Sequence, residues 1–172
     1  MQQGIERDAV DQIVGEWGRE MPDLDPAAKA VTHRIMRLAG LFDAAYAEVF
    51  KDQPFQAFRL QRGEYGVLAA LRRAGSPFAL TPTELGREQK MTSGGITAAV
   101  DRLERKALVR REPNPGDRRG TLVYLTPDGT SLIEAAMRRH ADVERELVAG
   151  LNERERAQLA DLLRRLLLGA ET

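Results

Sequence analysis

The segment between Leu80 and Gly129 constrains the fold of this 172-residue chain more than any other part. A hydroxyl residue followed by proline, Thr81 and Pro82, is typical of a helix start, because the hydroxyl caps free N–H groups and proline has no N–H to satisfy. A second capping position follows shortly afterwards, at Thr92 or Ser93. From there apolar residues recur at helical spacing: Ile96, Val100 and Leu103. The pattern predicts two short helices joined by a tight turn.

Two runs that favour strands follow directly, at 108–111 and 121–125. They are rich in leucine, valine, threonine and tyrosine, whereas residues 113–120 between them are rich in proline, glycine, asparagine and aspartate, which favour turns. A β-hairpin is therefore predicted immediately after the second helix. Two helices, a tight turn and a hairpin in this order are the parts of a winged helix-turn-helix, which places one helix in a DNA groove and the hairpin beside it.

Long amphipathic helices are predicted on both sides of this unit. One begins at Pro26, and two more begin after the capping residues Thr126 and Asn152. The predicted fold class is mainly α with a small β-wing. The expected domains are an N-terminal extension with dimerisation helices at 1–58, the winged helix-turn-helix DNA-binding domain at 59–125, and C-terminal dimerisation helices at 126–172.

These terminal helices carry more apolar surface than a small central unit can cover. The stripe on the last helix consists of Leu159, Leu162, Leu163, Leu166 and Leu167. Burying one exposed leucine or valine is worth about 1.5–3 kcal/mol, so such stripes favour a partner. A two-fold homodimer with intertwined terminal helices is predicted. The alternative is that these helices fold back on their own domain.

The composition excludes several classes of protein. The chain has no cysteine, which excludes disulfides, thiol redox sensing and cysteine-ligated zinc, and its two histidines are too few for a dedicated metal cluster. It has no apolar run of membrane-spanning length and no signal pattern, so a cytoplasmic location without a membrane partner is expected. A nucleophile motif and a phosphate-binding glycine loop are both missing. We therefore expect no enzyme activity, no catalytic residues, no metal and no cofactor.

The charge of the chain is unevenly distributed along the sequence. Residues 59–120 hold 13 basic and 7 acidic side chains, a net charge of +6, although the whole chain has a net charge of zero. A basic middle between acidic ends is expected when one part of a protein meets phosphate groups. The alternative is a solvated surface whose charges are segregated by chance.

Helical spacing identifies the side chains of the second helix that would face DNA. Small residues gather on the outer face of its first half, where they let the backbone approach base edges, and an arginine further along suits a phosphate or a guanine. Two arginines of the predicted hairpin loop suit the narrow minor groove, and Asp117 is expected to hold one of them in place. The predicted DNA contacts are Thr92, Ser93, Gly94, Thr97, Ala98, Arg102, Arg118 and Arg119.

The run from Thr81 to Gly129 resembles the MarR family of dimeric winged-helix regulators. The resemblance is carried by Asp117-x-Arg119 in the wing and by Leu125-Thr126-x-x-Gly129 at the start of the next helix. It implies transcriptional regulation, usually repression that a small ligand relieves.

The first helix and its surroundings look like the urate-responsive, PecS-like branch of that family. The branch binds its ligand through an indole, a carboxylate before the helix-turn-helix and an arginine on the recognition helix. Trp17 matches the indole, but Gly66 and Ala99 stand where the branch has the aspartate and the arginine. The resemblance therefore leaves urate without two of its three anchors. An aromatic or phenolic effector stacking on Trp17 is the hypothesis, and the alternative is that Trp17 is only a packing anchor.

The function predicted from the sequence is a sequence-specific regulator of double-stranded DNA. It would bind a pseudo-palindromic operator as a homodimer, act as a repressor and lose DNA affinity when the effector binds. A winged-helix protein-interaction module without specific DNA binding is the alternative.

Overall fold

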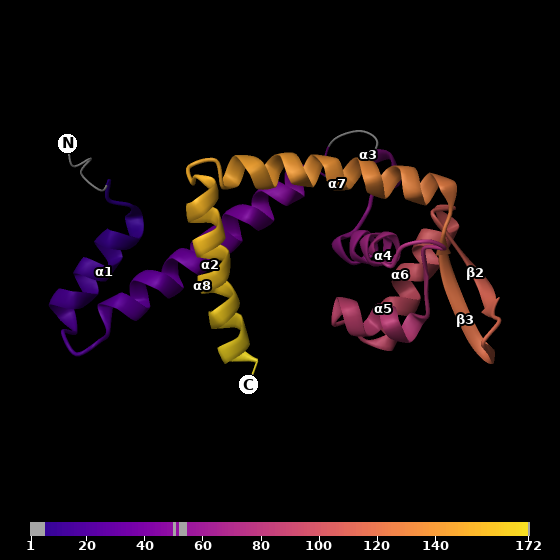
Figure 1. Cartoon of the computed structure of the whole chain (residues 1–172), viewed down its shortest axis with the longest axis horizontal. Helices are drawn as coiled ribbons and strands as arrows, with labels where there is room; N and C mark the ends of the chain where they lie inside the picture. Colours follow the sequence, from indigo (N-terminus) through magenta and orange to yellow (C-terminus); the bar gives the residue numbers. More distant parts are fainter. Residues whose placement is uncertain (1–5, 50, 52–54, 172) are drawn as a thin grey trace. The chain divides into compact units, whose positions relative to one another are not determined.

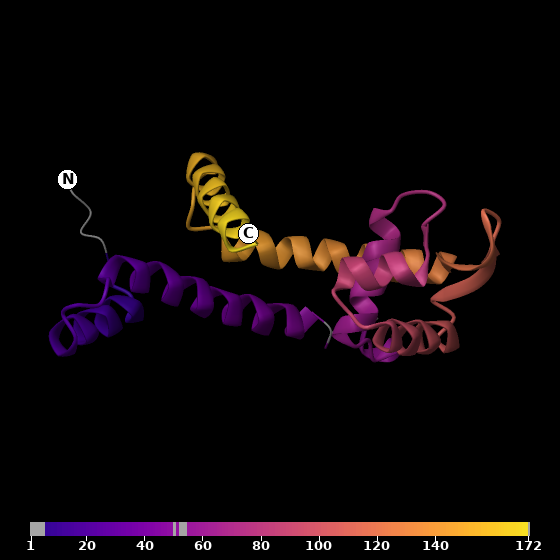
Figure 2. The same cartoon turned by 90° about the horizontal axis from the view of Figure 1, so that it is seen from below.

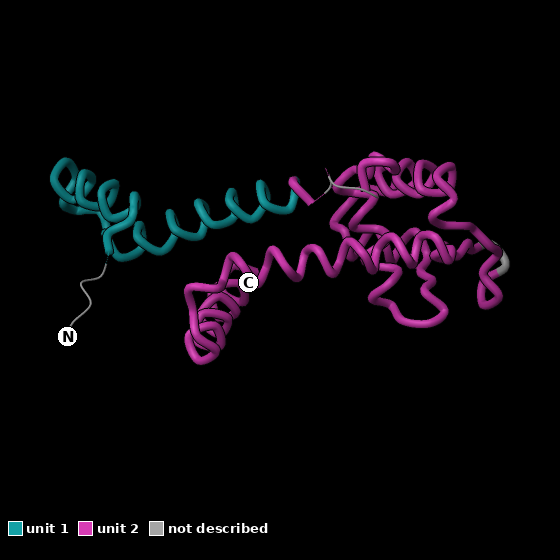
Figure 3. Tube along the Cα trace, turned by 90° about the horizontal axis from the view of Figure 1, so that it is seen from above, with its two compact units in different colours: residues 1–47 teal, residues 48–172 magenta. Residues whose placement is uncertain are grey.

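The structure is a computed structural model that describes residues 6–49, 51 and 55–171. It falls into two compact units, residues 1–47 and 48–172, drawn in different colours in Figure 3. Most of the described chain is helical, and the strands form one small antiparallel sheet. The predicted fold class is confirmed, whereas the predicted domain boundaries stay predictions.

The first unit is a pair of helices. α1 (Ala9–Glu20) is capped by Asp8, which forms a capping box with Asp11. α2 (Pro26–Val49) begins at a proline, as predicted. Arg34 of α2 donates to both capping carboxylates, at 2.8 Å to Asp8 and 2.7 Å to Asp11. These ion pairs join the start of α1 to α2.

The second unit has a continuous apolar core. Its helices are α3 (Phe55–Phe58), α4 (Arg62–Arg73), α5 (Pro82–Gln89), α6 (Ser93–Arg105), α7 (Pro127–Leu147) and α8 (Glu153–Ala170). The start of α7 packs across α4, as Figure 1 shows, and α4 also packs against α5 and α6. The largest fully buried side chains are those of Phe55, Leu68, Leu71, Leu85, Ile96, Leu103, Leu108 and Ile133. Residues 62–125 are called the winged-helix unit below.

The sheet has the strand order β1-β3-β2, with both pairs antiparallel. β2 (Val109–Asn114) and β3 (Asp117–Leu125) form a hairpin that extends away from the helices (Figure 2). Both strands are longer than predicted, so the turn is reduced to Pro115 and Gly116. β1 (Ala79–Leu80) was not predicted, because two residues give no periodic pattern.

The junction between the sheet and α7 is closely packed. Thr126 caps α7 by accepting from the Gly129 N–H at 3.0 Å, and its own hydroxyl donates to the Ala107 carbonyl at 2.8 Å. A Cβ at Gly129 would lie 2.0 Å from the Leu108 carbonyl oxygen. The Thr-x-x-Gly pattern therefore reflects a helix start that lies against the backbone of Leu108, in the connection between α6 and β2.

α8 contrasts with this core. Asn152 and Glu155 form a capping box at its start, but every residue of the helix is exposed. The five leucines of its predicted stripe are 37–62% exposed. None of the helices in the described ranges is long and apolar enough to cross a membrane.

Candidate nucleic-acid interface

The turn between α5 and α6 is tight because three consecutive residues close it. Lys90 ends α5 in the left-handed conformation, with φ of 50°, and the N–H of Met91 donates to the Gly86 carbonyl at 3.1 Å. Thr92 then caps α6 by accepting from the Gly95 N–H at 3.2 Å. The predicted helix-turn-helix is therefore present, with Thr92 rather than Ser93 as the cap.

α6 divides into a buried face and an exposed face of small residues. Ile96, Val100 and Leu103 are buried as predicted, and Ala99 joins them. The small residues that the sequence assigned to DNA are exposed: Thr92, Ser93, Gly94, Thr97 and Ala98. The hydroxyl of Thr97 donates to the Ser93 carbonyl at 2.9 Å, which leaves its oxygen as an acceptor. This face is open enough for a close approach to a base edge.

Arg102, further along α6, has a partner inside the protein. Its Nε donates to Oε1 of Glu64 on α4 at 3.0 Å, and the side chain is half-buried. The N–H of Gln61 and the Nζ of Lys106 donate to the other carboxylate oxygen, at 2.8 Å and 2.7 Å. The contact of Arg102 with DNA stays a prediction, and its ion pair with Glu64 was not foreseen.

Glu64 is a fully buried carboxylate. Burial raises the pKa of such a group, but the hydrogen bonds from Lys106, Gln61 and Arg102 outweigh it and leave the pKa below its ordinary value. Glu64 is therefore charged at neutral pH. The capping box of α4 was visible in the sequence as Gln61-x-x-Glu64, but its burial against α6 depends on tertiary packing.

The base of the wing is tied to α6 by Arg111 of β2. This side chain donates to Asp101 at 2.6 Å and to Glu104 at 2.5 Å. Burial lowers the pKa of Arg111, but the bonds to Asp101 and Glu104 outweigh it and raise the pKa overall. Asp101 on the outer face of α6 is thus paired with an arginine of the wing, a contact that the sequence analysis did not identify.

The two wing arginines lie in a strand, whereas a loop was predicted. Arg118 and Arg119 belong to β3 instead of a loop. Their side chains lie outside the described part of the chain, so the predicted pairing of Asp117 with Arg119 stays a prediction. Asp117 itself is exposed at the start of β3.

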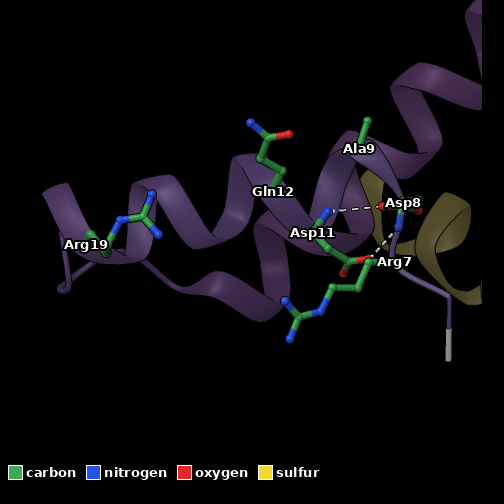
Figure 4. A pocket seen from close by; sticks show the side chains of 6 residues that line it. All are labelled: Arg7, Asp8, Ala9, Asp11, Gln12 and Arg19. Carbon is green, nitrogen blue, oxygen red and sulfur yellow. Dashed lines mark hydrogen bonds between the residues drawn. The ribbon is translucent and has the colours of Figure 1, made fainter. Parts of the chain in front are cut away.

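Trp17, the predicted effector contact, lies on α1 and is 41% exposed. The Lys29 ammonium of α2 lies 4.9 Å from the centroid of its ring. A hollow of about 720 Å³ on the same unit is lined by Arg7, Asp8, Ala9, Asp11, Gln12 and Arg19. Figure 4 shows these side chains spaced along α1, from Arg7 and Asp8 at its start to Arg19 near its end. The hollow is polar and does not include the indole, so it does not match the stacking site that the sequence suggested.

The two positions where the urate-responsive branch has charged residues are occupied differently here. A Cβ at Gly66 would lie 2.2 Å from the Gln89 side-chain oxygen, so a larger residue would have to displace that amide. Ala99 is fully buried on the face of α6 that packs against the core. The Gln89 amide therefore occupies the space beside the position of that branch's acid, and apolar packing replaces its base.

His140 of α7 is a core histidine. It is buried, its Nδ1 lies 2.7 Å from the Tyr65 hydroxyl, and burial lowers its pKa. Within the described ranges, no group of three or more His, Cys, Asp or Glu side chains is placed to hold a metal ion.

Comparison with known proteins decides the family. The model of the MarR family matches residues 60–120. The transcriptional regulator PecS of Dickeya dadantii is 34% identical over 157 residues, which cover 91% of this chain and 92% of that protein. The chain belongs to the MarR family. Its relatives are transcriptional regulators, which confirms both the resemblance and the expectation that it is not an enzyme.

Solved structures of DNA-binding proteins share the fold. A regulator of Streptomyces coelicolor in complex with DNA has a TM-score of 0.71 at 26% identity, covering 85% of this chain and 89% of that one. BpsR of Bordetella bronchiseptica, whose DNA binding is regulated by 6-hydroxynicotinic acid, has a TM-score of 0.64 at 27% identity, covering 79% of this chain and 91% of that one. The chain is thus a DNA-binding transcriptional regulator of the MarR family.

Proposed function

We propose that this MarR-family chain is a homodimeric repressor that binds a pseudo-palindromic operator and releases it when a small aromatic effector binds. The observation that carries the proposal is the outer face of α6, where five exposed small residues are presented by a well-capped helix. A helix so placed fits the major groove, and the hairpin beside it brings Arg118 and Arg119 toward the minor groove. The DNA complex of the Streptomyces relative supports this assignment.

The homodimer is supported by the exposed leucine stripe of α8. Two-fold symmetry of the protein would match two half-sites about one helical turn apart. The effector is supported by the 6-hydroxynicotinic acid response of BpsR and by the exposed indole of Trp17. Urate is disfavoured by Gly66 and Ala99.

DNA binding is tested by footprinting and fluorescence anisotropy on the DNA next to the protein's own gene, over a series of salt concentrations. Specific binding with a steep salt dependence supports the proposal, because each neutralised phosphate adds about 0.9 to the slope of log K against log salt. Charge reversal by Arg118→Glu with Arg119→Glu should weaken binding and flatten this slope. Equal affinity for operator and scrambled duplexes would instead favour the protein-interaction module.

The effector is tested by titrating 6-hydroxynicotinic acid and urate while recording tryptophan fluorescence and operator affinity. Trp17 is the chain's single tryptophan, so any change in the emission reports on its surroundings. Quenching together with a weaker operator complex is expected for the aromatic acid, and Trp17→Phe serves as the control. Unchanged emission and unchanged DNA affinity with both compounds would contradict this assignment.

A further inference from the structure

Glu64 combines features that the proposed DNA binding does not by itself explain. It is a fully buried charge on α4, and its two cationic partners both come from the C-terminal end of α6. A buried carboxylate is costly unless it is paired and hydrogen-bonded. Glu64 meets that condition through α6, so the packing of these two helices depends on the ion cluster as well as on apolar contacts.

The ion cluster constrains the rotation of α6 about its own axis, together with the buried apolar face of the helix. Arg102 and Lys106 are four residues apart and therefore project from the same face of the helix, one turn from each other. The same row continues toward the N-terminus through Ala98 and Gly94, both exposed. Anchoring the C-terminal end of the row to α4 therefore adds to the apolar packing in setting the direction in which the small residues point.

Lys106 closes the cluster on its other side. Its Nζ donates to Glu64 at 2.7 Å and to the Arg59 carbonyl at 3.3 Å, and Lys106 is also the C-cap of α6. A cation at this position is favoured by the negative end of the helix dipole. The end of α6 is thus tied both to the start of α4 and to the chain that precedes α4.

The form of the Arg102 contact leaves the outer part of its side chain available. The atom that donates to Glu64 is Nε, at the inner end of the guanidinium fork, and the side chain is 32% exposed. Because the fork is planar, a bond at Nε also orients the two terminal nitrogens. A guanidinium oriented before binding loses less conformational entropy when it meets a phosphate.

We propose that Glu64 is a positioning residue for DNA binding, holding Arg102 through Nε so that its terminal nitrogens meet a backbone phosphate while α6 keeps its orientation. The inference rests on the proposed operator binding and adds a residue that does not itself touch DNA. It also assigns two roles to Arg102, one toward Glu64 and one toward phosphate.

The test is a double-substitution cycle on the full-length chain. Operator affinity and its salt slope are measured for wild type, Glu64→Gln, Arg102→Ala and the double variant, using a duplex selected by the wild type from a random pool and a scrambled duplex. We expect Glu64→Gln to weaken operator binding about tenfold and to lower the salt slope by about 0.9, the value for one phosphate. The double variant should bind no more weakly than Arg102→Ala alone.

Two further variants keep the test decisive. Glu155→Gln removes the equivalent capping-box carboxylate from α8 and should leave the salt slope unchanged. Arg102→Lys keeps the charge but has no planar fork, so a contact with Glu64 no longer orients separate terminal nitrogens toward a phosphate, and the variant should lose most of the affinity that Arg102→Ala loses. Arg102→Lys leaves the charge of the buried Glu64 carboxylate in place. It therefore tests the proposal even if Glu64→Gln does not fold.

Each result has a definite meaning. A wild-type slope in Glu64→Gln, full additivity in the double variant, or wild-type affinity in Arg102→Lys would overturn the positioning role while leaving operator binding intact. Failure of the wild type to distinguish the selected duplex from the scrambled one would overturn the proposed function, and this inference with it.

Discussion

The helices of the winged-helix unit and the terminal helix α8 are all capped and amphipathic, yet the apolar faces are buried in the first region and exposed in the second. In the winged-helix unit, α4 and α6 bury their apolar residues against one another and against the sheet. In α8, every residue of the helix is exposed, including its leucine stripe. The first region satisfies its own packing, whereas the second has an apolar face that its own unit leaves uncovered, and the proposed dimer would bury it.

The largest effect is expected from breaking the proposed dimer. Leu159→Glu with Leu163→Glu places charges on the α8 stripe, and a two-fold interface carries each substitution twice. At about 1.5 kcal/mol or more for each lost leucine, the dimer dissociation constant should rise about 10⁴-fold. Analytical ultracentrifugation measures the change, while circular dichroism should show an intact winged-helix unit. Gln158→Glu on the same helix is the control, and a monomeric wild type would refute the dimer.

A large loss of stability is expected at the junction of α7 with the sheet. Gly129→Ala introduces a Cβ at 2.0 Å from the Leu108 carbonyl oxygen, and a backbone atom yields less readily than a side chain. Unfolding free energy from urea titration should fall by about 3 kcal/mol. Gly150→Ala is the matched control, because a Cβ there would have no neighbouring atom within 4 Å, and it should change stability by less than about 0.5 kcal/mol. Equal effects at the two glycines would contradict the close approach.

An intermediate effect is expected when Glu64 is neutralised, and it should depend on pH. The folded pKa lies below the ordinary value of 4.5, so the stabilisation is fully present above about pH 4.5 and is lost as the pH falls through the folded pKa. Glu64→Gln should cost about 2 kcal/mol at pH 7, because two charge-assisted hydrogen bonds are weakened. The difference in unfolding free energy between Glu64→Gln and wild type should become smaller as the pH falls. Urea titrations across this range measure it, and a gap that is constant with pH would be inconsistent with a charged Glu64.

The smallest effect is expected at Ala107, which has a φ of 57° in the connection between α6 and β2. An alanine in this left-handed region is strained, whereas glycine adopts it readily. Ala107→Gly should therefore raise the unfolding free energy by about 0.5–1 kcal/mol, as read from thermal or urea titration. A destabilised variant would show that the loss of the methyl group outweighs the relief of strain.

The sequence predicted those features that repeat or that carry strong local signals. Capping residues such as Thr81 and Thr126 located helix starts, and the spacing of Ile96, Val100 and Leu103 identified the inner face of α6. These signals depend on residues close together in the chain, which is why they are visible without a structure.

Long-range pairs were not predictable in the same way. Glu64 and Arg102 are 38 positions apart, and nothing local distinguishes their charges from those on a solvated surface. The short strand β1 and the full length of β3 likewise depend on the partner strand, which supplies the hydrogen bonds that propensity alone does not indicate. The candidate DNA face was thus predicted from the helix itself, and its anchoring only became visible from packing.

The contact between Gly129 and Leu108 makes the end of the wing and the beginning of α7 a single joint. Thr126 bonds to backbone groups on both sides of that joint, including the Leu108 carbonyl, which accepts from its N–H at 3.1 Å. Because the two backbones are in direct contact here, neither can approach the other more closely. The first turn of α7 and the base of the wing are therefore held in one fixed arrangement, which any side chain at position 129 would displace.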